Sequence, residues 1–295
     1  MMIPHVRQPY LALHKRSLQS RSKTNRLQHI TPKKINSILA VAIWKMSSKI
    51  PTRVLAGITV PDTPLIDAAI AFAKDHLNEM GFNHIMRSFL FGFCLASKDP
   101  KCSSRDLEAH AISAILHDMG WDQTGRLVSK DKRFEVDGAD ASRDFLSREA
   151  PSWDRHRVQL VWDAVALHSM PSINRFKAVE VEFCARGISA DFVGPDGTHG
   201  QLGWDEWDAI VREFPRLNLA DGVTEILCNF YRQKPETTYD NLVGDVGEAH
   251  LKGYSREGHK FVCPHLLLRP AELTLFRFTD RLKIARDVLD KRTIE

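Results

Sequence analysis

The sequence predicts an all-α protein, folded as a compact helical bundle. Apolar residues recur every three or four positions in several windows, which is the spacing of one face of an α-helix. The clearest windows run from Leu65 to Leu77 and from Leu107 to Ile115. No run of alternating β-branched residues competes with this pattern. At 295 residues, 43% of them hydrophobic, the chain can bury a full core in one or two domains.

The first predicted helix has a recognisable start. Asp62 or Thr63 can cap it, and Pro64 is tolerated in its first turn because the missing N–H would have no partner there. We expect this helix to run over residues 64–80. Gly81 is expected to end it, since glycine commonly terminates helices.

The next two predicted helices carry polar residues that could form a site. The second follows Gly81 and contains His84. The third begins near residue 104 and ends at His117-Asp118, with Gly120 as its stop. Side chains at a helix end are held firmly by the helix and stay open to a cavity.

Farther along the chain, the polar stretch 121–133 predicts a loop over this site. Asp191 is expected just past the end of a helix that stops near Gly187. Apolar periodicity and flanking turn residues predict the remaining helices at residues 138–148, 153–168, 176–188, 204–214 and 219–231.

Four of these residues are candidate ligands of one metal ion: His84, His117, Asp118 and Asp191. A neutral imidazole offers a nitrogen, and a carboxylate offers a hard oxygen that offsets the charge of the ion. Two of each leave positions open for water and substrate, as in a catalytic site. Such an ion can bring the pKa of a bound water down to about 7 and can polarise an electrophile.

The order of these residues is similar to that of the HD-domain metal-dependent phosphohydrolase superfamily, and the local motifs look most like its cyanamide hydratase branch. Asn83-His84 followed by Arg87 resembles the Asn-His-Ser-x-Arg opening of that branch. Phe134-Glu135 stands where the branch has Ser-Phe-Glu or Ser-Phe-Asp. The resemblance covers about residues 62–240 and includes three later motifs: Asp191-Phe192-Val193-Gly194, Phe214-Pro215-Arg216 and Lys234-Pro235.

The resemblance implies a helical bundle of the HD-domain type. It implies a hydratase or hydrolase that adds metal-activated water to a small electrophile, with the hydration of cyanamide to urea as the model reaction. One divalent ion is implied, Zn²⁺ ahead of Fe²⁺ or Mn²⁺, and no organic cofactor. Glu135 and His168 are the catalytic candidates for proton transfer and substrate orientation. The chain departs from the branch beside both, at Val136-Asp137-Gly138 and Ser169-Met170-Pro171.

Three other functions stay open. A phosphohydrolase acting on a nucleotide or phosphomonoester would want a cation near the ion, and the first one after His117-Asp118 is Arg126. A dinuclear oxygenase would need more ligands, for which Glu135 or Asp137 could serve. A non-catalytic metal-binding scaffold module would be expected to lack a ligand, and none of the four is missing.

Charge divides the chain into segments. Residues 1–61 carry eleven of the 41 Lys and Arg and no Asp or Glu, which leaves 30 basic side chains against all 37 acidic ones. The body therefore gives no reason to expect nucleic-acid binding, which needs a cationic face. We expect a basic leader at 1–61, the HD domain at 62–260 and a C-terminal extension at 261–295. An amphipathic helix over 271–291 could dock on the core or form a homo-oligomer contact.

The leader has three interpretations: an organelle transit peptide, a start misplaced from Met46, or a basic arm. The apolar run 38–44 is well under the roughly 18 residues of a membrane span, so no membrane partner is expected. Five cysteines without paired spacing are typical of a reducing compartment. We therefore expect a cytoplasmic protein with a small-molecule substrate, or a mitochondrial one if the leader is a transit peptide.

Overall fold

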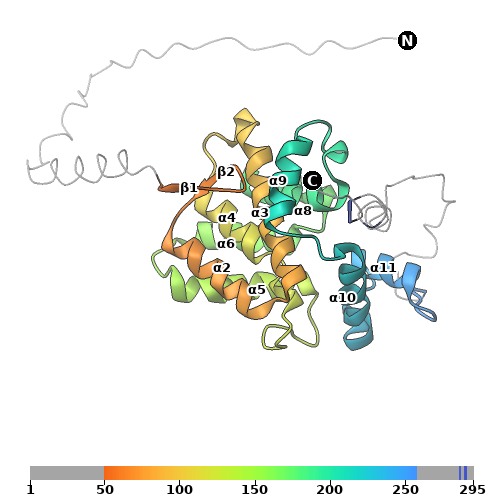
Figure 1. Ribbon diagram of the computed structural model, residues 1–295. Coiled ribbons are helices and arrows are strands. Elements are labelled where there is room, and N and C mark those ends of the chain that lie inside the picture. The colour runs from red at the N-terminus through yellow and green to blue at the C-terminus, as the bar shows by residue number, and fades with distance from the viewer. Residues whose placement is uncertain (1–49, 258–285, 287–288, 291–295) are drawn as a thin grey trace, which may run out of the picture. The chain divides into compact units, whose positions relative to one another are not determined.

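The computed structural model describes residues 50–257, 286, 289 and 290. The chain divides after Lys49, and the unit that begins at Ile50 contains all of these residues. They are mostly helical, which confirms the predicted all-α bundle (Figure 1). The α-helices are α2 (Pro64–His76), α3 (Glu79–Ser97), α4 (Leu107–Leu116), α5 (Phe134–Glu149), α6 (Arg155–Leu167), α7 (Pro171–Asn174), α8 (Val179–Val193), α9 (Trp204–Glu213), α10 (Leu219–Gln233) and α11 (Leu242–His250).

A two-stranded antiparallel hairpin precedes the helices. β1 (Thr52–Leu55) pairs with β2 (Ile58–Pro61), and Arg53 lies opposite Val60. Val60 is buried in the core. Residues 50–61 of the predicted leader therefore belong to the folded unit, and the rest of the predicted leader lies outside the described residues.

Side-chain caps mark where the first two α-helices begin. Thr63 accepts a hydrogen bond from the N–H of Ile66, so its predicted capping role is confirmed. Asn78 caps α3 in the same way, with its Oδ1 2.9 Å from the backbone nitrogen of Gly81. Gly81 consequently lies in the first turn of α3, and the prediction that it ends the preceding helix is wrong. An asparagine before a helical pattern starts a new helix more strongly than an interior glycine ends one.

Helices α3 and α8 pack against each other at the centre of the fold. Almost every α3 side chain from Met80 to Ala96 is buried. A Cβ added at Gly187 of α8 would clash with the carbonyl oxygen of Ser88 on α3. Only glycine permits this approach, and the close packing fixes the helices that carry His84 and Asp191 relative to each other.

The same contact explains a wrong prediction about where α8 ends. Gly187 lies inside α8 because its lack of a side chain serves the packing. The helix continues to Val193 and stops at Gly194, whose φ of 68° lies in the left-handed region. Asp191 therefore belongs to the last turn of α8, where the helix holds its backbone.

Between residues 240 and 257, the structure describes one helix that the sequence did not predict. Gly244 and Gly247 argue against a helix by propensity, yet α11 places both against other parts of the chain. A Cβ at Gly247 would lie 3.1 Å from the ring of Tyr254. The predicted helix over 271–291 lies outside the described residues except for 286, 289 and 290.

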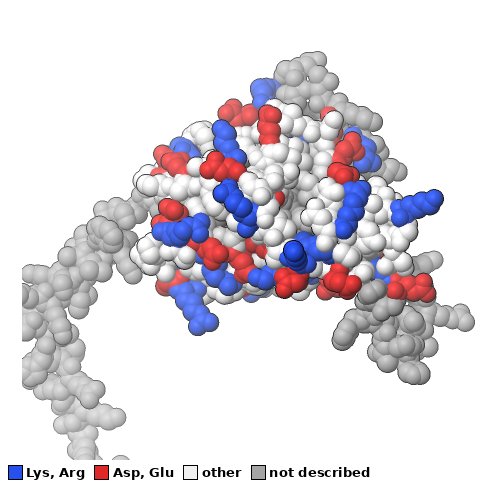
Figure 2. All heavy atoms as spheres, turned by 90° about the horizontal axis from the view of Figure 1, so that it is seen from below, with Lys and Arg blue, Asp and Glu red and all other residues white. Residues whose placement is uncertain are grey.

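Figure 2 shows one face of the molecule, on which acidic and basic side chains of the described residues are interspersed. Among the described helices, none has the length and apolar character needed to cross a membrane. The structure also describes four free, buried cysteines: Cys94, Cys102, Cys184 and Cys228.

Candidate metal centre

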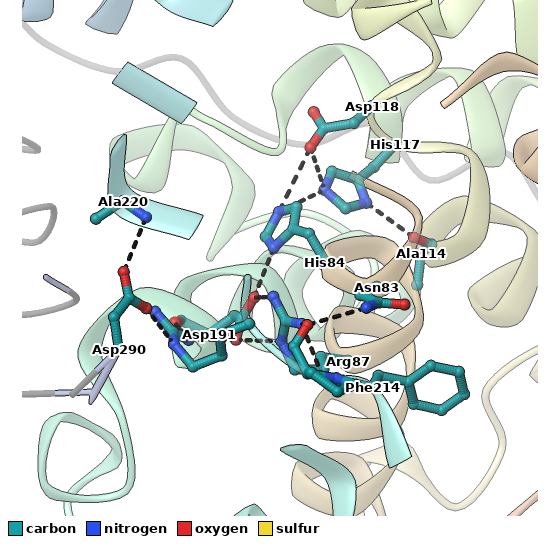
Figure 3. A network of polar contacts seen from close by, with 12 residues as sticks. Asn83, His84, Arg87, Ala114, His117, Asp118, Asp191, Phe214, Ala220 and Asp290 are labelled. Atoms are coloured by element: carbon teal, nitrogen blue, oxygen red, sulfur yellow. Dashed lines mark hydrogen bonds and ion pairs between the residues drawn. The ribbon is translucent and has the colours of Figure 1, made fainter. Parts of the chain in front are cut away.

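Two helices deliver the three residues that form a candidate metal site (Figure 3). His84 lies in the second turn of α3. His117 is the C-terminal cap of α4, and Asp118 follows it directly. Asp106 fixes the start of α4 by accepting a hydrogen bond from the N–H of Ala109 at 3.0 Å. The predicted position of the His-Asp pair at a helix end is therefore confirmed.

The ligand atoms of these residues converge within a small buried volume. His84 Nε2 lies 3.3 Å from His117 Nε2 and 3.4 Å from Asp118 Oδ2. His117 Nε2 lies 2.9 Å from the same Asp118 oxygen. Each of the three residues is at most 1% exposed. Among the described residues, they form a group that could hold a metal ion.

The opposite nitrogen of each imidazole fixes its tautomer. His117 Nδ1 lies 2.8 Å from the carbonyl oxygen of Ala114, which can only accept, so Nδ1 carries the hydrogen. His84 Nδ1 lies 2.7 Å from a carboxylate oxygen of Asp191 and donates in the same way. In the neutral rings, both Nε2 atoms therefore present lone pairs to the centre of the group.

These lone pairs face one another and a carboxylate, with no hydrogen-bond donor between them. Both Asp118 oxygens are buried without a hydrogen-bond partner among the described residues. Buried acceptors that face each other are costly unless a cation lies between them. An ion bound at about 2.0–2.1 Å keeps neighbouring ligand atoms roughly 2.9 Å apart in octahedral and roughly 3.3 Å apart in tetrahedral coordination. The observed spacings match this range, so the residues fit a divalent ion.

The electrostatics of the group also favour a cation. Burial disfavours the charged form of His84, but the adjacent carboxylates of Asp118 and Asp191 outweigh it and raise its pKa. Burial also opposes the ionised form of Asp118, yet its close contacts with the His117 and His84 rings keep its pKa well below the usual range. The carboxylate therefore stays ionised and attracts positive charge to the group.

Asp191, the fourth predicted ligand, contacts the site from the other side of the His84 ring. Its Oδ2 accepts from His84 Nδ1, whereas the converging atom of that ring is Nε2. The structure thus places Asp191 outside the group of three, and its direct ligation stays a prediction. The contact seen is a carboxylate that orients a ligand histidine and raises its basicity.

Two arginines hold Asp191 in its ionised form. Burial disfavours this charge, but the charges of Arg87 and Arg216 lower the pKa of Asp191 strongly. Arg87 donates to both carboxylate oxygens, at 2.9 Å from Nε and 2.8 Å from Nη2. Arg216 Nη1 lies 2.8 Å from Oδ1. This fork geometry fixes the carboxylate and, through it, the His84 ring.

Asp290, one of the described residues near the C-terminus, belongs to the same network (Figure 3). Asp290 accepts from Arg216 Nε at 2.6 Å and from the backbone N–H of Ala220 at the start of α10. Leu289 is 3% exposed and packs against Gly194, just after α8. Residues 289 and 290 therefore contact the core beside the candidate site, and whether the predicted helix docks there stays a prediction.

Comparison with known proteins adds no family to this picture. No protein-family model matches the chain, and no curated protein matches it. The chemical interpretation of the site therefore rests on its own geometry.

A cavity of about 200 Å³ opens beside the three candidate ligands. His84 and Asp118 form part of its wall, so a bound ion would face the cavity. Trp121 stacks on the His84 ring, with 5.6 Å between centroids and 17° between planes. From the sequence alone, this tryptophan is expected in the core or in a pocket wall, but not at this site. Its position against His84 of α3 follows from the turn of η2 (Met119–Trp121), which no spacing in the sequence indicates.

His168, one of the two catalytic candidates, lines this cavity next to Asp118. Its Nε2 lies 3.6 Å from Asp118 Oδ1, and its Nδ1 donates to the carbonyl oxygen of Val165 at 2.7 Å. Burial is the main cause that lowers the pKa of His168. The structure therefore brings His168 to the site as a neutral imidazole.

Glu135, the other candidate, lies behind the cavity wall. It is fully buried in the first turn of α5, which begins at Phe134, four residues earlier than predicted. Its carboxylate accepts from Ser169 Oγ at 2.6 Å and from Arg133 at 2.9 Å. Ser169 lines the cavity, whereas Glu135 is not part of its lining. The hydroxyl of Ser169 is thus a functional candidate that no motif in the sequence indicates.

Proposed function

We propose that this protein is a metal-dependent hydratase or hydrolase of the HD-domain type, with a cyanamide-like nitrile hydration as its model reaction. The observation that carries the proposal is the convergence of three acceptor atoms, from His84, His117 and Asp118, on a point beside a cavity. Such a cluster of buried acceptors is costly unless a cation lies between them. A structural metal site would be closed by protein ligands on all sides.

The three residues would hold one divalent ion, Zn²⁺ first and Fe²⁺ or Mn²⁺ as alternatives. When bound, the ion would supply an activated water and polarise an electrophile. In nitrile hydration one water adds across a carbon–nitrogen triple bond: oxygen bonds to carbon, nitrogen gains the protons, and the product is an amide or urea.

The proton transfers of this reaction are assigned to the residues on the cavity wall. His168 is neutral and can accept a proton at Nε2, which faces Asp118. Ser169 can orient the substrate nitrogen through its hydroxyl. Glu135 is a positioning residue, because it fixes Ser169 and does not line the cavity. A buried carboxylate held by Arg133 keeps that hydroxyl in one orientation.

Phosphomonoester hydrolysis is the second candidate, and one observation favours it. Arg175 and Arg186 contribute to the cavity lining, and arginine is well suited to bind phosphate. Nitrile hydration ranks first because both arginines engage surface partners: Arg175 lies over the ring of Phe176, and Arg186 pairs with Gln201 and Glu182. A metal-binding scaffold without activity is the third outcome.

One experiment separates these outcomes. The full chain is purified, loaded in turn with Zn²⁺, Fe²⁺ and Mn²⁺, and its bound metal is counted by mass spectrometry. Each form is then assayed for urea from cyanamide and for phosphate release from a panel of phosphomonoesters. We expect one ion per chain and urea formation. Phosphate release alone would favour the second candidate, bound metal without any turnover the scaffold, and no bound metal would overturn the proposal.

Replacing Glu135 with glutamine tests its positioning role. The neutral amide weakens the hydrogen bonds from Ser169 and Arg133, each worth about 1.5–3 kcal/mol when one partner is charged. We expect turnover to fall roughly 10- to 100-fold at unchanged metal content, since each 1.4 kcal/mol corresponds to about a factor of ten. The matched control is Glu108→Gln, in a carboxylate that pairs with Thr63 and Arg157 away from the site. Unchanged kcat in Glu135→Gln would refute the role.

A further inference from the structure

The geometry points to a substrate whose electrophilic group is attached to an apolar group about the size of a small branched alkyl chain or a phenyl ring. This inference rests on the proposed function and assigns its substrate class. It comes from the shape and lining of the cavity beside the metal centre, where the apolar group would be bound.

The cavity has a polar end and an apolar body. The polar end is formed by the candidate ligands His84 and Asp118, together with His168. Aromatic rings pack directly on these histidines: Phe192 lies 5.2 Å from His84 and Phe134 lies 5.7 Å from His168, measured between ring centroids. A substrate that reaches the metal centre must therefore lie between apolar surfaces.

The aliphatic part of the wall comes from separate elements. Ile188 belongs to α8, Val223 and Leu227 to α10, and Leu242 to α11. Val223 and Leu227 are each 1% exposed, so their side chains are fixed in the core. A pocket with a few convergent polar groups and a mainly apolar lining is typical of small-molecule sites. The lining therefore favours a substrate that carries a hydrocarbon group.

The size of the cavity decides against cyanamide itself as the best substrate. A cavity of about 150 Å³ with apolar walls is known to take up benzene, and one water occupies about 30 Å³ of liquid. The cavity here measures about 200 Å³. Cyanamide has three heavy atoms and would leave most of this volume to water or empty. A ring or a branched chain of four or five carbons would fill it.

The charged groups of the lining do not change this conclusion. The guanidinium of Arg175 is on an exposed residue and lies over the Phe176 ring, and Arg186 pairs with Glu182 and Gln201. Both are therefore partnered at the surface. The uncharged polar side chains of the lining are those of Ser169, Asn174 and Ser189. Ser169 donates to Glu135, and Asn174 donates to the carbonyl oxygens of Leu167 and His168.

The test uses a homologous series of nitriles on the metal-loaded full chain. Dissociation constants are measured calorimetrically for acetonitrile, propionitrile, butyronitrile and benzonitrile. We expect binding to tighten by about fourfold for each buried methylene, equivalent to about 0.8 kcal/mol, and benzonitrile to bind tighter than acetonitrile by more than tenfold. Affinities that stay flat or fall with size would overturn the inference.

Two substitutions of one wall residue distinguish an effect of cavity size on nitrile preference from a general loss of stability. Val223→Ala enlarges the cavity and should shift the preferred nitrile to a longer chain. Val223→Leu shrinks the cavity and should shift the preference to a shorter chain. Val211, a buried valine of α9 that is not part of this lining, supplies the matched controls Val211→Ala and Val211→Leu. The controls should leave the preference unchanged, and a parallel shift in them would overturn the inference.

Leu242→Ala keeps the inference testable if a core variant fails to fold, because Leu242 is only partly buried. Its loss should weaken the binding of butyronitrile more than that of acetonitrile, and equal weakening would count against the inference. Failure of the proposed function would look different. A chain that binds no metal refutes that function, whereas a metal-loaded chain that hydrates cyanamide but shows no dependence on nitrile size refutes the substrate class alone.

Discussion

Replacing His117 with alanine is expected to remove the bound metal and all turnover. His117 supplies one of three atoms that converge within 3.4 Å of one another, and its ring is locked by the carbonyl oxygen of Ala114. Loss of an outer partner of a metal ligand typically weakens metal affinity about 10- to 100-fold, and loss of a ligand itself should weaken it further. Metal content per chain and affinity by chelator competition measure the effect.

A matched histidine elsewhere controls for the substitution itself. His156 is exposed on α6 and lies outside the group of three, so His156→Ala should retain one ion per chain and full turnover. The thermal unfolding of both variants is recorded to show that each is folded. Stoichiometric metal in a folded His117→Ala protein would contradict the assignment of the site.

The part of the site that follows from local sequence could be predicted from the sequence alone. His117 and Asp118 follow a helix whose cap, Asp106, and apolar pattern are both local features. Their position at the helix end depends on nothing distant in the chain. The same is true of the all-α fold class, because the amphipathic periodicity of each helix is a property of its own sequence.

Three features that were missed depend on contacts between distant segments. Gly187 indicates a helix end by propensity, but its role is to let α8 approach Ser88 of α3. Asp191 therefore lies within a helix and meets His84 through Nδ1, a geometry that no spacing reveals. Similarly, nothing local to Asp290 indicates that it bonds Arg216, 74 residues away.

The hairpin of β1 and β2 was missed for a different reason. Residues 50–61 share the acid-free composition of the segment before them, so composition alone does not separate them from that segment. The structure instead buries Val60 in the core. Composition averages over a segment, whereas burial is decided residue by residue.

Replacing Arg87 with methionine is expected to lower the free energy of unfolding by about 3–5 kcal/mol, the usual cost of breaking a buried ion pair from one side. Arg87 is fully buried and makes two hydrogen bonds to Asp191. It also donates to the carbonyl oxygens of Phe214 and Pro215, both at 2.9 Å. The substitution leaves the Asp191 carboxylate with half of its cationic partners. Urea denaturation of the metal-free protein measures the loss.

The control is the same substitution at an arginine on the surface. Arg232 pairs with Glu225 at 2.7 Å, and both side chains are about half exposed or more. Exposed pairs contribute about 0–1 kcal/mol, so Arg232→Met should change the stability little. A loss in Arg87→Met no larger than in this control would show that the network of Arg87, Asp191 and Arg216 does not stabilise the fold.

The double variant Arg87→Met with Asp191→Asn separates charge from packing. If the cost of Arg87→Met arises mainly from an uncompensated carboxylate, neutralising Asp191 removes that cost, and the double variant loses less than the two single losses added together. Metal affinity gives the second readout: both single variants should weaken it because the His84 ring loses its orientation. Strict additivity of the stability losses, together with unchanged metal affinity, would mean that Arg87 supports packing alone and that His84 is oriented by α3 without help from Asp191.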